Sequence, residues 1–351
     1  MALRFFSCTD FRCVSSVNLE PDARYNLIYG SNASGKTSLL EAIACLGRGK
    51  SFRGAPTDRL VRHGASEFLL FGRVEEAGRA QTIGVRNGRC GLEISIDGDR
   101  SGGTAALAMT LPLQVVDPEV HNLVAGGPEH RRRYLDWIAF HVEPDYLRVW
   151  RRFRRVLRQR NAALRSGADL RGWDPEFTEG ALAVHEARQR ALEQTLGALE
   201  RTGRRLLGSR VGFEYTHGWN AGLSFPEALA AGLERDQQTG TTQSGPQRAD
   251  LRLVYDERQA RKLVSRGQQK LLACAMILAA TEVAQEKLGR SMLLLLDDPA
   301  AELDEHSLER LMQDVAALQN QVIATSLEPE PRLFPEAPAR FHVERGTLSP
   351  G

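Results

Sequence analysis

The stretch Gly30-Ser31-Asn32-Ala33-Ser34-Gly35-Lys36-Thr37 lies between the apolar, strand-like residues 25–29 and a helical pattern over 38–43. It satisfies G-x-x-x-x-G-K-[ST] in the strand–loop–helix context that a phosphate-binding P-loop requires. Its glycines let backbone N–H groups curl around phosphates, and the helix N-terminus adds partial positive charge. We therefore predict that all eight residues bind ATP, with Lys36 at the β- and γ-phosphates and the Thr37 hydroxyl on Mg²⁺.

A second stretch, Ser291-Met292-Leu293-Leu294-Leu295-Leu296-Asp297-Asp298, ends an apolar run with two carboxylates. Four consecutive leucines are typical of a buried parallel strand, and open α/β sheets bind ligands at the carboxyl ends of such strands. We predict that Asp297 holds Mg²⁺ and that Asp298 polarises the attacking water. The separation of Lys36 from Asp297, 297 − 36 = 261 residues, indicates a large insertion between the two halves of the nucleotide-binding head.

A third stretch, Leu263-Val264-Ser265-Arg266-Gly267-Gln268-Gln269-Lys270, resembles the signature L-S-x-G-Q of ABC ATPases. Ser265 and Gln268 also form an S-x-x-Q capping box at the start of a buried helix, and the two interpretations are compatible because a capped helix N-terminus is an anion site. In ABC-type ATPases this site meets the γ-phosphate bound to the other subunit. The signature therefore predicts that Ser265 and Gly267 contact the ATP of a second copy of the chain.

Three weaker candidates follow the order of the same ATPase class. Gln114 is placed like a Q-loop residue, Ala301-Glu302-Leu303-Asp304 is placed like a D-loop, and Thr325 ends a strand where transporters carry a histidine switch. Together with Lys36 and Asp298, Gln114 and Thr325 are the predicted catalytic residues. Since Asp298 is one methylene shorter than the usual glutamate, we expect slow hydrolysis.

These motifs predict an α/β fold: an ABC-type P-loop ATPase head with a mixed sheet and flanking helices, interrupted by a short helical arm. The head is expected to comprise residues 1–120 and 251–351, with the signature helix at 265–285, and the helical lobe and its connecting loop residues 121–250. Strand-like segments at 68–75, 81–86 and 92–97 indicate a β-meander. Apolar stripes at helical spacing indicate two antiparallel helices in the arm, carried by Trp150, Phe153, Val156, Leu157 and Leu164, and by Leu192, Leu196, Leu199 and Leu206.

The arm concentrates positive charge. Residues 148–165 contain eight arginines and no acid, although the net charge of the chain is only +2. Such a run can be a solvated helix face, but like charges repel one another without acidic partners, and a phosphate backbone would relieve that repulsion. We predict salt-sensitive contact with DNA, without base readout, by Arg131, Arg132, Arg151, Arg152, Arg155 and Arg158.

Composition sets the remaining bounds. The chain has 351 residues, 42% hydrophobic and 26% charged, which is typical of a globular protein large enough for two lobes. No apolar stretch approaches the roughly 20 residues that span a bilayer, and the N-terminus lacks a signal-peptide core. The five cysteines show no metal-ligand spacing, so we expect reduced thiols and a cytoplasmic protein with no membrane partner.

Along nearly its whole length the chain resembles the RecF family of recombination-repair ATPases, which belongs to the SMC/ABC class. The resemblance is carried by Asp10-Phe11-Arg12, residues 39–43, Gly49-Lys50-Ser51-Phe52-Arg53, Gly126-Gly127-Pro128, Arg131-Arg132, Leu135-Asp136-Trp137, residues 158–164, residues 263–272, Leu296-Asp297-Asp298 and Glu302-Leu303-Asp304. The chain departs from the family at Ala33, where glycine is usual, and at Ser244-Gly245-Pro246-Gln247-Arg248-Ala249-Asp250, which lacks both histidines of H-G-P-H-[RK]-x-D.

The resemblance implies ATP and Mg²⁺ as cofactors, with Arg12 among the nucleotide contacts. It implies an ATP-dependent homodimer that clamps double-stranded DNA near single-strand gaps and junctions, weak DNA-stimulated ATPase activity, and the partners RecR and RecO, which promote recombinase loading. One alternative is the ATPase subunit of an ABC transporter, which would require a membrane partner. Another is a binding module with a relic site, against which the intact Lys36, Thr37 and both aspartates argue.

Overall fold

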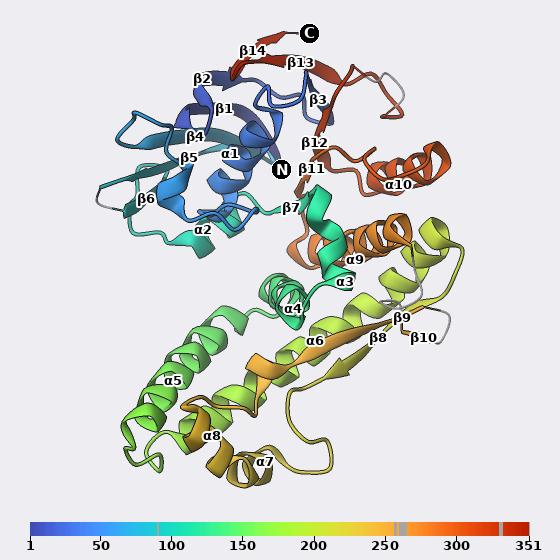
Figure 1. Ribbon diagram of the computed structural model, residues 1–351. Coiled ribbons are helices and arrows are strands. Elements are labelled where there is room, and N and C mark those ends of the chain that lie inside the picture. Colours follow the sequence, from blue (N-terminus) through green and yellow to red (C-terminus); the bar gives the residue numbers. More distant parts are fainter. Residues whose placement is uncertain (90, 256–257, 260–264, 330–332, 351) are drawn as a thin grey trace. The chain divides into compact units, whose positions relative to one another are not determined.

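The computed structural model describes residues 1–89, 91–255, 258–259, 265–329 and 333–350 (Figure 1). The chain divides into two compact units, Met1–Val120 with Gly289–Gly351, and His121–Leu288. The sequence predicted a return to the head at residue 251, whereas residues 251–288 belong to the second unit. The reason is tertiary pairing: β9 (Asp250–Tyr255) pairs with β8 (Val211–Thr216), and α9 (Arg266–Leu288) packs on α6 (Asp174–Leu207).

The first unit contains a five-stranded antiparallel sheet of order β2-β1-β4-β5-β6. Its strands are β1 (Ala2–Phe11), β2 (Val14–Leu19), β4 (Phe68–Glu76), β5 (Arg79–Gly88) and β6 (Gly91–Ile96). The predicted β-meander is therefore confirmed. Its first turn uses Ala77 at φ 47° and Gly78 at φ 77°, the left-handed geometry of a tight hairpin.

A six-stranded mixed sheet, of order β14-β13-β3-β12-β11-β7, holds the P-loop and the leucine run. Its strands are β3 (Tyr25–Tyr29), β7 (Leu113–Val116), β11 (Leu293–Leu296), β12 (Gln321–Ser326), β13 (Ala339–Glu344) and β14 (Thr347–Pro350). β3, β12, β11 and β7 run parallel, which confirms the predicted buried parallel strand. Helix α1 (Lys36–Arg48) contacts strands of both sheets, and its side chains join one hydrophobic core with them. The unit is completed by η1 (Thr57–Leu60), α2 (Thr104–Thr110) and α10 (Glu305–Ala317).

The second unit begins with α3 (Asn122–Ala125), which follows the short turn η2 (Pro118–His121), and is built mainly from helices. Helices α4 (Pro128–Val142), α5 (Tyr146–Ser166) and α6 pack together. The predicted antiparallel pair is confirmed by contacts in reversed order, since Arg152 of α5 bonds to Glu179 of α6 and Arg160 bonds to Asp174. Of the predicted apolar stripe on α6, Leu196 is an exception, because it is 39% exposed.

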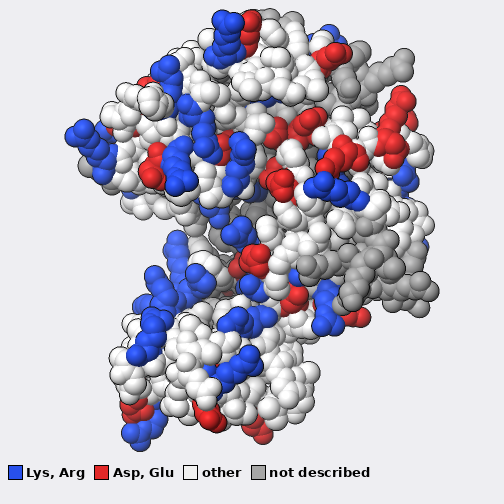
Figure 2. All heavy atoms as spheres, viewed as in Figure 1, with Lys and Arg blue, Asp and Glu red and all other residues white. Residues whose placement is uncertain are grey.

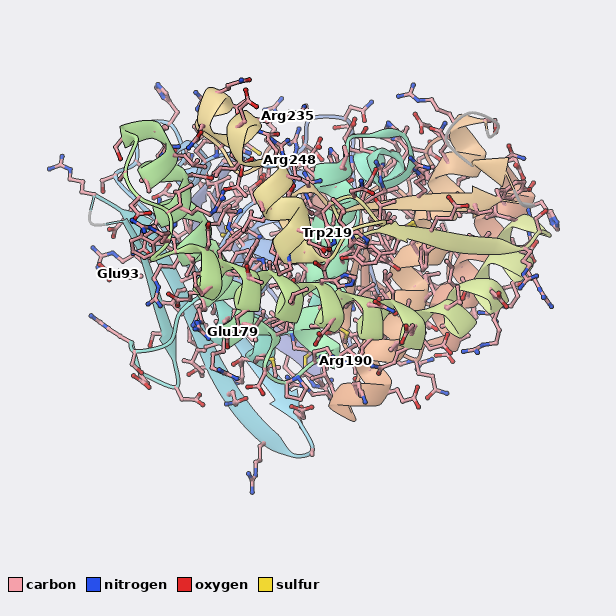
Figure 3. The ribbon with its side chains drawn as sticks, turned by 90° about the horizontal axis from the view of Figure 1, so that it is seen from below. Glu93, Glu179, Arg190, Trp219, Arg235 and Arg248 are labelled. Carbon is pink, nitrogen blue, oxygen red and sulfur yellow. The ribbon has the colours of Figure 1, made fainter. Side chains whose placement is uncertain are left out.

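The segment that lacks the family's histidines ties the helices of this unit to its small sheet, β10-β9-β8, in which β10 is Arg258–Gln259. Asp250 accepts two hydrogen bonds from the buried Arg131, at 2.7 and 3.1 Å, and the Pro246 carbonyl accepts one from Arg188 at 2.7 Å. The segment contains η3 (Pro246–Arg248), and α7 (Phe225–Ala231) and α8 (Leu233–Thr239) precede it in the chain. Figure 3 shows Trp219 and Arg248 in this region.

The structure describes four of the five cysteines and the helices that were tested for membrane-spanning character. Cys8, Cys45 and Cys274 are free and buried, whereas Cys13 is free and exposed. Cys90 lies outside the described residues. Within the described part of the chain, no helix combines the length and the apolar character needed to cross a membrane.

Candidate functional site

The P-loop follows β3, and its first residue has a backbone conformation and surroundings that only glycine fits. Gly30 has φ 155°, and a Cβ there would lie 2.3 Å from the Val343 carbonyl oxygen. The loop ends at Gly35, φ 115°, which caps α1 without a side-chain hydrogen bond, and the first turn of α1 carries no acid. The N-terminal N–H groups of α1 therefore point at a position suited to an anion.

Two polar groups of the loop indicate which ligand chemistry it suits. The Ser34 hydroxyl is buried and has no hydrogen-bond partner among the described residues, which in a folded protein calls for a ligand or water. The Lys36 ammonium donates to the Gly30 and Ser31 carbonyls, at 2.6 and 2.9 Å, and so folds along the loop. Burial lowers the pKa of Lys36, while Asp298 and Asp297 oppose that shift. A loop with open N–H donors, an unpartnered hydroxyl and a lysine fits a nucleotide's phosphates.

Ala33 explains why glycine is usual at its position in the family. Its φ is 61°, in the left-handed region where a Cβ costs roughly 1–2 kcal/mol. Alanine at this position therefore stores backbone strain in the loop.

The carboxyl edge of the parallel strands brings the predicted metal ligands together. The Thr37 hydroxyl donates to Asp297 Oδ1 at 3.0 Å, and the Thr325 hydroxyl donates to the same oxygen at 2.8 Å. Burial raises the pKa of Asp297, and the hydrogen bonds from Thr325 and Thr37 counter this. A hydroxyl beside a buried carboxylate is a donor set of hard oxygens, which suits Mg²⁺.

Asp298 is held in an unusual backbone conformation. Its φ is 48°, and its N–H donates to Thr325 Oγ1 at 2.9 Å. Thr325 thus bridges both aspartates, through its hydroxyl proton to Asp297 and through its oxygen to the Asp298 N–H. The residue predicted as a switch is therefore in place to fix the orientation of the acidic pair.

Gln114 does not reach this edge, so its predicted catalytic placement is wrong. In the register of β7 with β11, Gln114 pairs with Leu294, three residues before Asp297, and its Oε1 accepts from Arg48 at 3.1 Å. Strand β7 begins at Leu113 and continues past Gln114 for two residues. The glutamine is consequently a buried strand residue.

Asp117 occupies the edge position instead, and the sequence prediction missed it. The Asp297 N–H donates to the Val116 carbonyl at 2.8 Å, so Asp117 and Asp297 leave neighbouring strands at the same level. Burial and the proximity of Asp297 raise the pKa of Asp117 to about 6. The available signal was an aspartate directly after an apolar run, the same signal that identified Asp297.

Arg12, an expected nucleotide contact, is engaged within its own unit. Its Nε and Nη2 each donate to Glu41 at 3.0 Å, and Glu41 is fully buried on α1. Ser51 donates to the same carboxylate. This bidentate pair anchors the β1–β2 turn to the P-loop helix, and a direct contact of Arg12 with nucleotide stays a prediction.

The signature residues open α9 of the second unit. The Ser265 N–H donates to Gln268 Oε1 at 2.9 Å, and the Gln268 N–H donates to Ser265 Oγ at 3.3 Å. The predicted capping box is confirmed, and Ser265 is exposed at the helix start. Leu263 and Val264 lie outside the described residues.

The basic arm is less uniform than its sequence indicates. Arg160 is fully buried between Asp174 and Asp236, and Arg152 donates to Glu176 and Glu179 of α6, the latter labelled in Figure 3. Arg155 lies 3.6 Å from Glu176. The acids that the run lacks in sequence are therefore supplied by a neighbouring helix.

Two of the predicted DNA contacts in α4 are also engaged. Arg131 is 5% exposed and bound to Asp250, so its prediction as a surface contact is wrong. Arg132 donates to the Ala249 carbonyl at 2.9 Å, and burial lowers its pKa. Arg151 and Arg158 remain exposed on one face of α5, where they make no ion pair with any described residue, and Figure 2 shows basic side chains gathered over this helix.

Comparisons with known proteins agree with this geometry. The family model described as "RecF/RecN/SMC N terminal domain" matches residues 2–343. The chain is 37% identical to the DNA replication and repair protein RecF of Shewanella pealeana over 99% of both chains. It is 38% identical to the protein of that name from Pseudomonas fluorescens, over 99% of this chain and 98% of that one.

Solved structures show the same fold. A structure of "the recombination mediator protein RecF-ATP in RecFOR pathway" superposes with a TM-score of 0.89 at 24% identity, covering 100% of this chain and 97% of that one. An SMC head bound to the C-winged helix domain of ScpA superposes with a TM-score of 0.61 at 15% identity, covering 99% and 96%. This similarity of fold to SMC heads agrees with the ATPase head, interrupted by a short helical insertion, that the sequence predicts.

Proposed function

The chain belongs to the RecF family of the SMC/ABC ATPase class, and on that premise we propose that it is an ATP-operated switch of DNA replication and repair. The observation that carries this proposal is the pair of hydroxyls, from Thr37 and Thr325, that donate to one oxygen of Asp297, together with Lys36 on the P-loop. A relic site would not keep this hydrogen-bonded set.

ATP would bind with its phosphates over the N-terminus of α1. The Ser34 hydroxyl would gain the partner that it lacks, and Lys36 would exchange two loop carbonyls for phosphate oxygens. Mg²⁺, held by Thr37 and Asp297, would neutralise charge on the phosphates. Asp298, oriented by Thr325, would position the attacking water for a slow hydrolysis that resets the switch.

ATP would also join two copies of the chain. The Ser265 capping box presents a helix N-terminus whose end is exposed, which supports contact with the γ-phosphate of a second copy. The closed dimer would clamp double-stranded DNA near gaps or junctions, using the exposed arginines of α5. One structure named for the RecFOR pathway supports RecR and RecO as partners of this chain. Relatives named for DNA replication and repair support a function of this chain in the cytoplasm.

Sedimentation velocity with and without ATP, and with and without duplex DNA, tests this proposal. We expect the wild type to dimerise only with ATP and Ser265→Arg to bind ATP yet stay monomeric. Lys36→Ala should lose ATP binding altogether, because the ammonium at the phosphates is gone. Mixing the two variants leaves one composite site with both halves unmutated and should restore part of the dimer. Normal ATP-dependent dimers of Ser265→Arg would contradict the shared site.

The ABC transporter alternative has little support. Thr325 stands where a transporter carries histidine, and the family of the chain is a DNA-repair family. No second function is favoured by a specific observation.

A further inference from the structure

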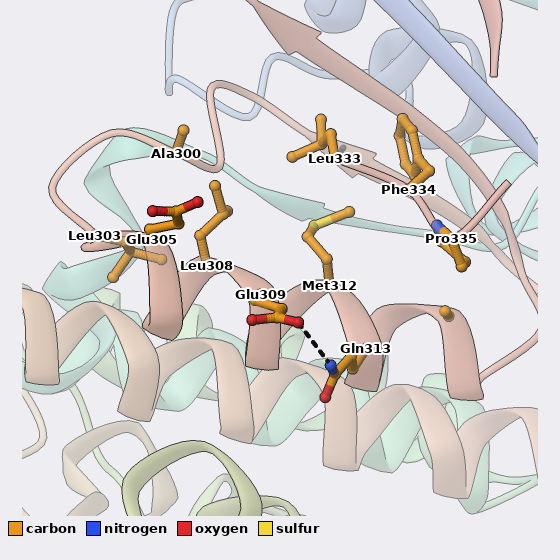
Figure 4. A pocket seen from close by; sticks show the side chains of 11 residues that line it. Ala300, Leu303, Glu305, Leu308, Glu309, Met312, Gln313, Leu333, Phe334 and Pro335 are labelled. Atoms are coloured by element: carbon orange, nitrogen blue, oxygen red, sulfur yellow. Dashed lines mark hydrogen bonds between the residues drawn. The ribbon is translucent and has the colours of Figure 1, made fainter. Parts of the chain in front are cut away.

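An apolar groove of about 910 Å³ runs along α10 of the first unit (Figure 4). One wall is α10, which contributes Leu308, Met312 and Ala316, and the other wall is the segment Leu333-Phe334-Pro335. Ala300 and Leu303, just before α10, close one end. Apart from Leu303, which belongs to the predicted D-loop, none of the residues predicted to contact nucleotide or DNA lines this surface. Met312, Leu333 and Phe334 are buried, whereas Leu303, Leu308 and Ala316 are half-buried and accessible to a partner.

The groove has the length and periodicity of a helix. Its lining residues on α10 fall at 305, 308, 309, 312, 313 and 316, the spacing of one helix face. The twelve residues from 305 to 316 are separated by eleven rises of 1.5 Å and span about 16 Å, which corresponds to about three turns of a partner helix. Leu308, Met312 and Ala316 follow one another along the α10 wall at intervals of four, so a partner's apolar residues spaced by three and four would interdigitate with them.

The rim is acidic. Glu305 and Glu309 lie one turn apart, and among the described residues Glu305 makes no ion pair and Glu309 is bonded to Gln313, at 3.4 Å. Like charges at this spacing destabilise a helix unless a cation lies between them. Figure 2 shows red side chains over this part of the first unit. The rim therefore complements lysine or arginine.

We propose that the groove between α10 and residues 333–335 docks an amphipathic helix of another protein. The helix would insert an apolar stripe into the groove, and lysine or arginine side chains beside that stripe would pair with Glu305 and Glu309. A small-molecule ligand fits less well, because its site would need several convergent polar groups, and the polar side chains here are Glu305, Glu309 and Gln313 at the rim.

A second copy of the chain also fits less well. The large apolar residues that are exposed on its described helices are Met109 on α2, Leu196 on α6 and Leu233 on α8. Helix α2 has seven residues and spans about 10 Å, so it is shorter than the groove. Leu196 is flanked by Glu193 and Glu200, and Leu233 is followed by Glu234. These acids would meet the acidic rim and repel it.

Fluorescence anisotropy of the full chain with three labelled model peptides tests the proposal. One peptide carries a leucine stripe with lysines beside it, one carries the same stripe with glutamates, and one has the lysine peptide's residues in scrambled order. The lysine peptide should bind at least about tenfold more tightly than either control. Equal binding of the lysine and glutamate peptides would overturn the proposal.

Matched variants locate the binding. Leu308→Gln with Ala316→Gln, both at half-buried positions, should weaken the lysine peptide at least about tenfold. Glu305→Gln with Glu309→Gln should reduce the preference for lysine, and Glu234→Gln, an exposed glutamate that also pairs with a glutamine one turn away, should leave it unchanged. ATP binding and melting temperature verify that each variant is folded.

Photo-cross-linking of the wild type is independent of these variants. A benzophenone group within the leucine stripe should label α10 or residues 333–335. Labels confined to other segments would overturn the assignment. If the Leu308→Gln, Ala316→Gln protein instead loses ATP-dependent dimerisation in sedimentation, the groove serves a second copy and the proposal is wrong.

Discussion

Replacing Asp117 by asparagine is expected to stabilise the nucleotide-free protein at neutral pH. Burial is the main reason that the pKa of this carboxyl is raised from 3.8 to about 6, and the neighbouring Asp297 adds to the shift. At pH 7 the native state therefore holds an ionised carboxylate in an environment that disfavours its charge. Asparagine removes the charge, keeps the shape and can still accept the backbone hydrogen bond from Glu119.

The magnitude follows from linkage. A pKa about two units higher in the folded state costs about 3 kcal/mol of stability above pH 6. The cost is absent below about pH 4, where the group is protonated in both states, and it grows as pH rises between about 4 and 6. Arg48, whose own pKa burial lowers to about 10, loses an attractive neighbour in the variant. The net gain should therefore be about 1–3 kcal/mol, or a melting temperature higher by about 2–10 °C.

Thermal unfolding of both proteins from pH 4 to pH 8, without nucleotide or Mg²⁺, measures this gain. The difference should be close to zero at pH 4 and largest above pH 6. Asp99→Asn is the matched control, because a backbone hydrogen bond from Ser101 lowers the pKa of that exposed carboxyl and its loss should not stabilise the protein. A variant that melts below the wild type at pH 7.5, or an equal gain at pH 4 and pH 7.5, would refute the reasoning.

Three further outcomes are expected. Ala33→Gly should relieve the left-handed backbone of the P-loop and raise the free energy of unfolding by about 1 kcal/mol in denaturant titrations, whereas Gly167→Ala, at φ 68° in an exposed helix cap, should lower it. Asp298→Asn should still bind ATP, and in sedimentation its ATP-bound dimer should stay on DNA. In phosphate-release assays the wild type should turn over well below about 10 s⁻¹. Hydrolysis by Asp298→Asn at the wild-type rate would contradict the role assigned to Asp298. Arg151→Gln with Arg158→Gln should reduce the slope of log affinity for duplex DNA against log salt by about 2, while Arg152→Gln, whose guanidinium already binds Glu176 and Glu179, should change it less. Equal effects of all three arginines would show that the ion pairs to α6 do not matter.

Local motifs were readable from the sequence because each depends on residues adjacent in the chain. The P-loop needs a strand, a glycine-bearing turn and a helix start, and all three occur within residues 25–43. The leucine run before Asp297 and the capping box of Ser265 with Gln268 are equally local. For such segments, periodicity and turn chemistry decide the structure before any long-range contact forms.

The partners of charged and edge residues were decided by tertiary structure. Whether Gln114 or Asp117 reaches the nucleotide edge depends on the register of β7 against β11, which pairs residues about 180 positions apart. The arginine run has no acid of its own, yet α6 folds back and supplies Glu176, Glu179 and Asp174. Residues 251–288 likewise join the second unit because β9 pairs with β8 and α9 packs on α6. Sequence alone therefore determined which chemistry the chain carries, and long-range pairing and burial determined which side chains are available to perform it.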